Sequence, residues 1–279
     1  MKESQVSRTS LLTAYFSPTG TTKKIVETIA GSIQCEKRRT LDFTPKSIRE
    51  NASADFSGDL VIIGSPVYYG RIPNEVADYL SKIHVNNLYA ILVVVYGNRE
   101  YEDSLKELYD AACNAGFLPI ACTAFIGEHS YSSKKLPMAH GRPDEMDLEK
   151  AKLFGATIQK HLDFLITQYN TIKMSIPGSS DYKNKTIPKY PVAPEVLKEQ
   201  CAICKKCLEI CPVEAIAIDS QSNLITDINL CILCFACVKN CPSHARGIDD
   251  TLWSQAMELL QKKCLERKEP EFYYSFPGH

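Results

Sequence analysis

Residues 15–25 read YFSPTGTTKKI and decide the fold, because they join an apolar stretch to an amphipathic one. The apolar residues before them are typical of a buried strand, and the periodicity after Thr21 predicts a helix. Backbone N–H groups in a turn before a helix can bind an anion, and hydroxyl side chains around Gly20 add donors. Neither a P-loop nor a dinucleotide fingerprint fits the sequence, so the loop suits a monophosphate. A merely capped helix is the alternative interpretation of this turn taken alone.

Strand-like and helix-like stretches alternate from Leu11 to about Tyr169. We expect strands at 11–16, 37–43, 59–64, 88–96 and 119–126, and helices at 21–32, 73–83, 102–115 and 147–169. Four of the strands are apolar enough to be buried on both faces, whereas the second is weaker and is expected at an edge. This order predicts an α/β fold with a doubly wound, five-stranded parallel sheet.

The S-x-T-G-x-T pattern of residues 17–22 resembles the phosphate loop of flavodoxins, and two more loops of that family follow in order. GSPVYYGRIP (64–73) is similar to the loop beside the flavin ring, and YGNREYED (96–103) is similar to the loop whose tyrosine stacks on it. The resemblance covers about residues 8–168 and places all three loops at carboxyl ends of strands, where such sheets bind ligands. It implies FMN, bound by Ser17, Thr19, Gly20, Thr21, Thr22, Pro66, Tyr68, Tyr69, Gly97, Asn98 and Tyr101.

Within this set, the resemblance gives particular residues separate roles. It implies that Tyr101 stacks on the flavin ring, that Tyr68 or Tyr69 supplies a second ring contact, and that Asn98 binds the pyrimidine edge. Ordinary half-exposed packing is the alternative for each tyrosine.

The stretch after the fifth strand, Gly127 to Met146, is unusually long for a loop at this position. It reaches the same edge as the flavin loops, so it could serve as a lid, a substrate contact or a docking surface for another domain. Its histidines, His129 and His140, have no identifiable acid–base partner in the sequence, and we assign no catalytic residue.

Eight of the twelve cysteines fall within residues 201–241, in two copies of C-x2-C-x2-C-x3-C-P that lie thirty positions apart. This run is that of bacterial ferredoxins with two [4Fe-4S] clusters, in which the fourth cysteine ligates the other cluster. One predicted ligand set is therefore Cys201, Cys204, Cys207 and Cys241, and the other is Cys231, Cys234, Cys237 and Cys211. Structural zinc is the alternative, but zinc modules usually separate two C-x2-C pairs by a long loop.

Residues 196–250 closely resemble the clostridial-type ferredoxins, which implies a small α+β domain and low-potential one-electron transfer. We expect the flavodoxin-like domain at 1–170, a proline-rich linker at 171–195, the ferredoxin domain at 196–250 and a C-terminal helix with a tail at 251–279. The whole chain is thus similar to a flavodoxin–ferredoxin fusion. A domain as small as the ferredoxin part needs its clusters to hold its fold.

Charge and hydrophobicity limit the kinds of partner and location that we expect for this protein. The formal net charge is -1, with 32 basic and 33 acidic residues, so nothing attracts nucleic acid or an anionic membrane. No apolar run is long enough to span a membrane, and no signal peptide is evident, which predicts a cytoplasmic protein. Cluster cores and the FMN phosphate add negative charge, which favours a redox partner with a basic docking face.

Electron transfer is the predicted function, between FMN, the two clusters and a redox partner. Two alternatives remain open at this point. One is an FMN-dependent reductase, fed by the clusters, that acts on a small acceptor or on NAD(P)H. The other is a ferredoxin whose flavodoxin-like domain has lost FMN and only docks. The sequence does not decide whether the protein is an enzyme, nor its oligomeric state.

Overall fold

A mostly parallel sheet forms the centre of the computed structural model, which describes residues 10–51, 55–168, 174–184 and 192–275. Its order is β10-β5-β4-β3-β1-β2. The parallel strands are β1 (Ser10–Tyr15), β2 (Lys37–Asp42), β3 (Leu60–Pro66), β4 (Leu88–Tyr96) and β5 (Phe117–Ile126). In the parallel register, Leu11 faces Leu60, Leu60 faces Tyr89 and Leu88 faces Phe117. The predicted doubly wound fold is confirmed.

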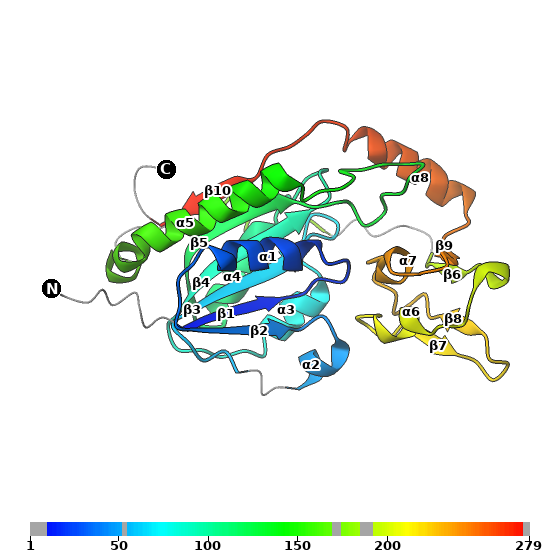
Figure 1. The fold of residues 1–279 in the computed structure, drawn as a ribbon, viewed down its shortest axis with the longest axis horizontal. Helices are drawn as coiled ribbons and strands as arrows, with labels where there is room; N and C mark the ends of the chain where they lie inside the picture. The colour runs from blue at the N-terminus through cyan, green and yellow to red at the C-terminus, as the bar shows by residue number, and fades with distance from the viewer. Residues whose placement is uncertain (1–9, 52–54, 169–173, 185–191, 276–279) are drawn as a thin grey trace.

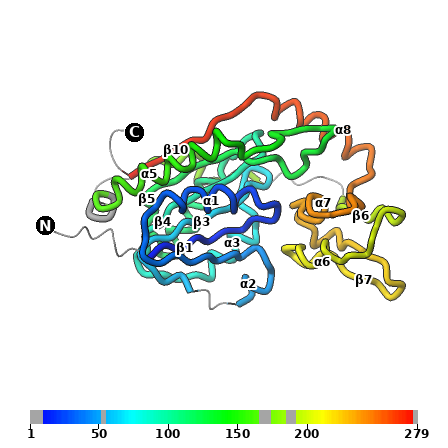
Figure 2. Tube along the Cα trace, in the orientation of Figure 1, coloured from blue at the N-terminus to red at the C-terminus, as the bar shows by residue number. Residues whose placement is uncertain are grey.

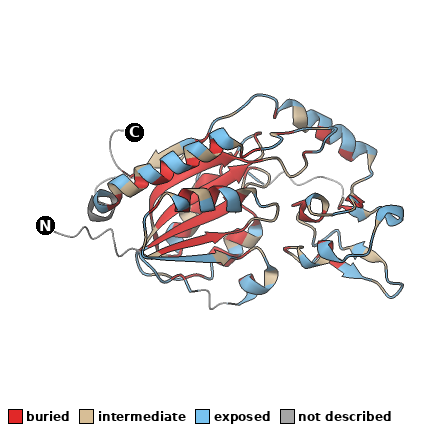
Figure 3. Ribbon diagram, in the orientation of Figure 1, coloured by how far each residue is buried: buried red, intermediate tan, exposed pale blue. Residues whose placement is uncertain are grey.

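The strands differ in burial as their sequences predict. Strands β1, β3, β4 and β5 are almost wholly buried, because helices cover both of their faces (Figure 3). Strand β2 carries the polar sequence KRRTLD, is largely exposed, and lies at the edge of the sheet as predicted.

Helices cover the sheet on two sides (Figure 1). The flanking helices are α1 (Thr21–Gly31), α3 (Asn74–Leu80), α4 (Ser104–Asn114) and α5 (Glu145–Gln168), and a short α2 (Lys46–Glu50) follows β2. Apolar residues of α1 and α5, such as Ile25 and Phe154, form one core with the sheet. Residues of α3 and α4, such as Tyr79 and Leu108, form the other core. No helix within the described ranges is both long and apolar enough to cross a membrane.

The cysteine-rich region, residues 192–250, lies beyond the carboxyl ends of the parallel strands (Figures 1 and 2). Its elements are β6 (Glu195–Val196), a 3-10 turn (Lys198–Gln200), α6 (Lys206–Glu209), β7 (Ile216–Ile218), β8 (Leu224–Thr226), α7 (Ala236–Lys239) and β9 (Arg246–Gly247). Antiparallel pairs join β6 to β9 and β7 to β8. The region is therefore a small α+β unit, as its sequence predicts.

The two halves of this region share one backbone path. Left-handed residues at 203, 205 and 214 recur at 233, 235 and 244, and α6 recurs as α7. Every recurrence is displaced by thirty positions, the interval of the cysteine repeat. The sequence repeat is thus a structural repeat.

The chain returns to the central sheet after the cysteine-rich region, which the sequence did not predict. Helix α8 (Thr251–Lys262) begins at Asp250, whose carboxylate accepts a hydrogen bond from the backbone N–H of Trp253. Strand β10 (Glu271–Tyr274) then pairs antiparallel with β5, and its Phe272 stacks on Phe154 of α5 at 5.2 Å. The sheet therefore has a sixth strand beyond the five expected.

Part of the predicted linker packs against the sheet domain. Met174 and Ile176 contact its core, and the carboxylate of Asp103 accepts hydrogen bonds from the backbone N–H groups of Ser179 (2.9 Å) and Lys183 (2.8 Å). Residues 169–173 and 185–191 of this segment lie outside the described ranges. The described part is anchored to α4 and does not extend freely.

Candidate functional site

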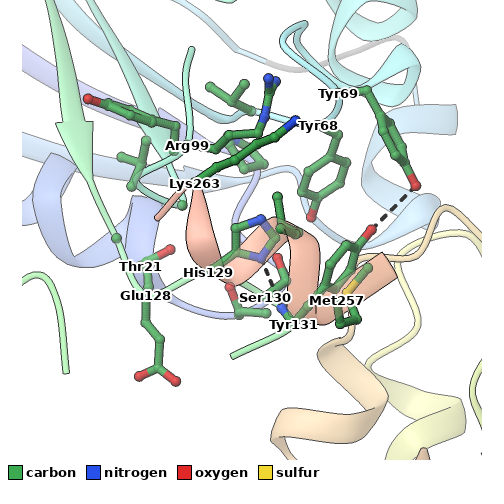
Figure 4. A pocket seen from close by; sticks show the side chains of 18 of the residues that line it. Thr21, Tyr68, Tyr69, Arg99, Glu128, His129, Ser130, Tyr131, Met257 and Lys263 are labelled. Carbon is green, nitrogen blue, oxygen red and sulfur yellow. Dashed lines mark hydrogen bonds between the residues drawn. The ribbon is translucent and has the colours of Figure 1, made fainter. Parts of the chain in front are cut away.

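A cavity of about 400 Å³ opens at the carboxyl ends of the central strands (Figure 4). Its walls are the loop before α1, the loops after β3, β4 and β5, and one side of α8. A volume in this range is typical of sites for small molecules and cofactors. Of the eleven residues predicted to bind FMN, its lining includes Thr19, Thr21, Pro66, Tyr68, Tyr69 and Gly97.

The loop before α1 caps the helix through Ser17 and leaves one hydroxyl, that of Thr22, without a partner among the described residues. Gly20, the N-cap residue, adopts a left-handed conformation (φ 87°) and makes no side-chain cap bond. The hydroxyl of Ser17 accepts a hydrogen bond from the backbone N–H of Lys23 at 2.9 Å. The Thr22 hydroxyl is buried and has no hydrogen-bond partner among the described residues. A buried hydroxyl without a partner costs about 1–3 kcal/mol.

A tight turn presents two tyrosines to the cavity. Tyr68 and Arg71 exchange backbone hydrogen bonds at 2.9 and 3.1 Å, while Tyr69 (φ 55°) and Gly70 (φ 77°) adopt left-handed conformations between them. The hydroxyl of Tyr69 lies 3.3 Å from that of Tyr131. Burial raises the pKa of the Tyr68 hydroxyl, and the nearby Cys234 thiol raises it further. The cavity wall thus adjoins the second cysteine run.

The imidazole of His129 is neutral in this cavity. Burial, together with the charges of Arg99 and Lys239, lowers the pKa of His129 to about 4. Its Nδ1 atom accepts a hydrogen bond from the backbone N–H of Tyr131 at 3.2 Å. The ring packs directly on Gly97, where an added Cβ would lie 2.3 Å from it. The position after β4 therefore requires glycine because His129 occupies the adjoining space.

Two residues predicted to contact the flavin ring, Tyr101 and Asn98, do not line this cavity. Tyr101 is buried in the core, where its hydroxyl donates to Glu271 of β10 at 2.7 Å. Asn98 is also buried and donates to the carbonyl oxygens of Cys264 (2.8 Å) and Glu266 (2.7 Å). Both side chains hold the returning C-terminal segment. Ser17, Gly20 and Thr22 belong to the phosphate loop but also lie outside the lining.

Helix α8 supplies a wall that the sequence analysis did not anticipate. Trp253, Met257 and Leu260 line the cavity, and Lys263 follows at its rim. Their spacing places them on one face of the helix. This apolar edge was visible in the sequence, but nothing there indicated which surface it covers.

A second, smaller cavity is lined by Cys211, Cys231, Cys234 and Cys237, with Pro212 and Phe235 among the other lining residues. Burial raises the pKa of the Cys237 thiol to about 11. The three cysteines of the second run and the last of the first run are thus brought together, which is the grouping predicted for one cluster. A four-iron cluster takes one thiolate for each iron, so its ligands surround a volume and not a point.

The remaining cysteines form a related group at the other half of the repeat. Cys207 is buried and lies near Cys241. The Cys241 sulfur accepts a hydrogen bond from the backbone N–H of Ala245 at 3.2 Å, as Cys211 does from Ala215 at 3.3 Å. Within the described ranges, no three His, Cys, Asp or Glu side chains converge as ligands of a single metal ion.

Comparisons with known proteins place both halves of the chain. Residues 12–140 match the family model of the flavodoxin domain, and residues 183–246 match that of the 4Fe-4S dicluster domain. The chain joins a flavodoxin domain to a 4Fe-4S dicluster domain. These two domains imply FMN and iron–sulfur clusters as cofactors, and they characterise an electron-transfer protein.

Solved structures similar to this chain include several flavodoxins. One is an archaeal flavodoxin that is 13% identical in sequence, with a TM-score of 0.39. The match covers 55% of this chain and 99% of the flavodoxin. A Fusobacterium nucleatum flavodoxin bound to flavin mononucleotide is 16% identical, with a TM-score of 0.39. The match covers 55% of this chain and 98% of that flavodoxin. The rubredoxin oxygen:oxidoreductase of Desulfovibrio gigas is 19% identical, with a TM-score of 0.41. The match covers 58% of this chain and 38% of the oxidoreductase. No curated protein matches the chain.

The residues of the main cavity fit FMN. Thr19 and Thr21 bring hydroxyl donors to the cavity at the N-terminus of α1, which suits a phosphate because a phosphate accepts several hydrogen bonds. Tyr68 and Tyr69 offer aromatic surface to a planar ring.

The two domains are held together by an aromatic contact. The ring of Tyr131, from the loop after β5, lies 4.6 Å from Phe235 and 5.0 Å from Trp253 between centroids, and Phe235 stacks on Trp253 at 5.7 Å. Lys239 of the dicluster domain donates to the Glu128 carboxylate at 2.6 Å and to the Ser132 carbonyl oxygen at 2.7 Å.

A second contact joins the domains on the side of α2. Arg49 donates to the carbonyl oxygen of Pro212, and Lys46 pairs with Glu214 at 3.1 Å. The two domains therefore adjoin at two places, one just after the first cysteine run and one within the second.

Proposed function

We propose that this protein carries electrons between FMN in the main cavity and two [4Fe-4S] clusters in the dicluster domain, and onward to a separate redox partner. The observation that carries the proposal is the position of Tyr68 and Tyr69. Both line the cavity beside Tyr131, whose ring lies 4.6 Å from that of Phe235 in the second cysteine run. A bound flavin exchanges electrons in pairs or singly, whereas each cluster passes one electron at a time.

The chain's own residues bind and orient the cofactors in this proposal. The backbone N–H groups at the start of α1, with the Thr19, Thr21 and Thr22 hydroxyls, hold the phosphate. Tyr68 and Tyr69 contact the ring, and Trp253 and Met257 of α8 exclude water from its outer side. His129 offers its neutral Nε2 as a hydrogen-bond donor, because Nδ1 already accepts from Tyr131.

For the dicluster domain we propose crossed ligand sets. Cys211 joins Cys231, Cys234 and Cys237, with which it lines one cavity. Cys241 joins Cys201, Cys204 and Cys207, and it lies near the last of these. The first set holds the cluster next to the flavin cavity, and the second holds the cluster farther from it.

Anaerobic stopped-flow reduction of the holoprotein tests the proposal. Cluster bleaching and flavin reduction are followed at separate wavelengths after mixing with dithionite, with flavin-depleted protein as the control. We expect an internal phase, present only with flavin bound, whose rate is independent of protein concentration because the domains are already in contact. Independent reduction of the two cofactor types, or purification without flavin under conditions that retain iron, would refute the proposal.

A further inference from the structure

The two halves of the dicluster repeat have one backbone but opposite surroundings. In the second half, we call residues 232–236 the covered loop. These residues are buried or half-buried, and Leu233 is 6% exposed. In the first half, we call residues 202–206 the open loop. These residues are all exposed, and Ile203, at the position that matches Leu233, is 59% exposed. Both loops carry the middle cysteine of a run: Cys234 is buried and Cys204 is exposed.

The covered loop packs against the flavodoxin domain. Phe235 packs on Tyr131 and Trp253, and Ile232 packs against the core of the flavodoxin domain. The loop is therefore the contact through which one cysteine run meets the domain with the flavin cavity. The open loop repeats its left-handed residues and its following helix, so it presents the same type of face to solvent.

The differences between the loops indicate what covers the open one. Phe235 and Ala236 are replaced at the matching positions by Lys205 and Lys206, both exposed. Neither lysine forms an ion pair with another described residue, although Glu209 follows in the same helix. Beside them, a cavity of about 400 Å³ is lined by Glu195, Lys198, Cys201 and Ile203, among others, so the charges of its lining balance and the excess positive charge comes from Lys205 and Lys206. The face thus combines an apolar centre, a hollow and unpaired positive charge.

We infer that the open loop is the docking surface for a separate one-electron carrier protein with an acidic face; this rests on the proposed function. On docking, the reduced carrier loses one electron and this protein gains one at the Cys201–Cys207 side, and the reverse transfer uses the same contact. The local charge favours an acidic partner, whereas the net charge alone favours a basic one. Electrostatic pairing raises the rate of encounter and makes it depend on salt.

Charge reversal at the open loop tests the inference. The double variant Lys205→Glu, Lys206→Glu is compared with Lys82→Glu, Lys160→Glu, which changes net charge equally on exposed residues of the flavodoxin domain. The probe is a reduced acidic two-cluster ferredoxin, mixed with each holoprotein at low ionic strength. We expect a second-order rate about tenfold or more lower for the open-loop variant, with a weaker salt dependence, and a rate within about twofold of wild type for the control. Equal rates for the two variants would overturn the inference.

A second variant keeps the charge and changes the apolar centre. Ile203→Asn is chosen because asparagine tolerates the left-handed conformation of this position (φ 51°). Leu265→Asn, at a residue 71% exposed outside the dicluster domain, is the matched control. We expect Ile203→Asn to slow ferredoxin-driven reduction about threefold or more and Leu265→Asn to leave it unchanged. The opposite ranking would contradict the docking surface.

Two further readouts separate failure of the inference from failure of the proposed function. Iron content and the electron paramagnetic resonance spectrum of each dithionite-reduced variant show whether both clusters are intact. Dithionite, a small reductant that needs no docking surface, reports the internal phase directly. Intact clusters and a normal internal phase, with unchanged reduction by ferredoxin, would refute the docking surface alone. Loss of the internal phase in wild type would refute the proposed function.

Discussion

The ring centroids of Tyr131 and Phe235 lie 4.6 Å apart, across the boundary between the flavodoxin domain and the dicluster domain. Tyr131 belongs to the long loop after β5 that lines the main cavity, and Phe235 belongs to the second cysteine run. One side chain therefore touches both the main cavity and the loop that we propose holds the nearer cluster. Domain contact is built into the fold at this point and does not depend on a flexible tether.

Removing the Tyr131 ring should loosen this contact. Each aromatic pair contributes about 0.5–1.5 kcal/mol beyond its buried area, and Tyr131 forms pairs with Phe235 and Trp253. We expect Tyr131→Ala to raise amide hydrogen exchange in residues 231–237 by about tenfold or more. Tyr131→Phe keeps the ring and loses only the hydroxyl contact with Tyr69, so its exchange should stay near that of wild type. Equal protection in the alanine variant would show that the contact is incidental.

Replacing Thr22 with valine should separate stability from cofactor binding. The Thr22 hydroxyl is buried without a described partner, so valine of similar shape should stabilise the flavin-free protein by about 1 kcal/mol. The same change removes a donor from the proposed phosphate site and should weaken FMN binding by a similar free energy. Thermal unfolding of flavin-depleted protein and flavin titration measure the two effects. Thr28→Val, outside the loop on the same helix, is the control.

A valine variant that loses stability and keeps its FMN affinity would show that the hydroxyl serves packing and not the phosphate. Opposite signs of the two effects are the signature of a binding group, because a group that serves only the fold would not be stabilised by its removal.

The sequence predicted the parallel sheet and its flanking helices because their signals are local. Strand β4 occupies the predicted Leu88–Tyr96, and the polar β2 lies at the predicted edge. The cysteine run of bacterial ferredoxins likewise predicts that Cys211 lies with Cys231, Cys234 and Cys237, and these four line one cavity. Periodicity and spacing need no knowledge of distant parts of the chain.

The contacts of the C-terminal segment were not predictable from the sequence. Tyr101 matched a flavodoxin position by sequence, but β10 supplies Glu271 and Tyr273 as partners for its hydroxyl. Helix α8 has apolar residues on more than one side, and only tertiary packing selects Trp253 and Met257 for burial while Leu252 and Leu259 stay exposed. Such choices depend on residues more than a hundred positions away, which local patterns do not encode.

Acid should destabilise the fold in part through His129. Its pKa is lowered in the folded protein to about 4 from an ordinary 6.5, so the unfolded chain binds the proton more readily. The contribution of His129 to the free energy of unfolding is therefore largest above pH 6.5. It decreases as the pH falls toward 4, by at most about 3 kcal/mol.

The His129→Asn variant isolates this contribution from that of the carboxylates. Asparagine can still accept from the backbone N–H of Tyr131 but does not titrate. We expect its free energy of unfolding to fall less steeply than that of wild type between pH 6.5 and 4. Identical slopes in urea unfolding series would mean that the imidazole is protonated, or solvated, in the folded protein.

Cys211→Ala should damage the cluster nearer the flavin cavity and leave the farther one intact. Cys211 follows Cys201, Cys204 and Cys207 in sequence, yet it lines a cavity with Cys231, Cys234 and Cys237. Wild-type protein purified without oxygen should contain about eight irons, four for each cluster. The variant should lose up to half of that iron, retain the resonance of one four-iron cluster, and lose the internal electron-transfer phase while dithionite still reduces the surviving cluster. Cys113→Ala, at an exposed cysteine of the flavodoxin domain, should change none of these properties. If Cys211→Ala instead removed the cluster of Cys201, Cys204 and Cys207, the ligands would not cross between the halves, and the order of electron flow proposed here would be wrong.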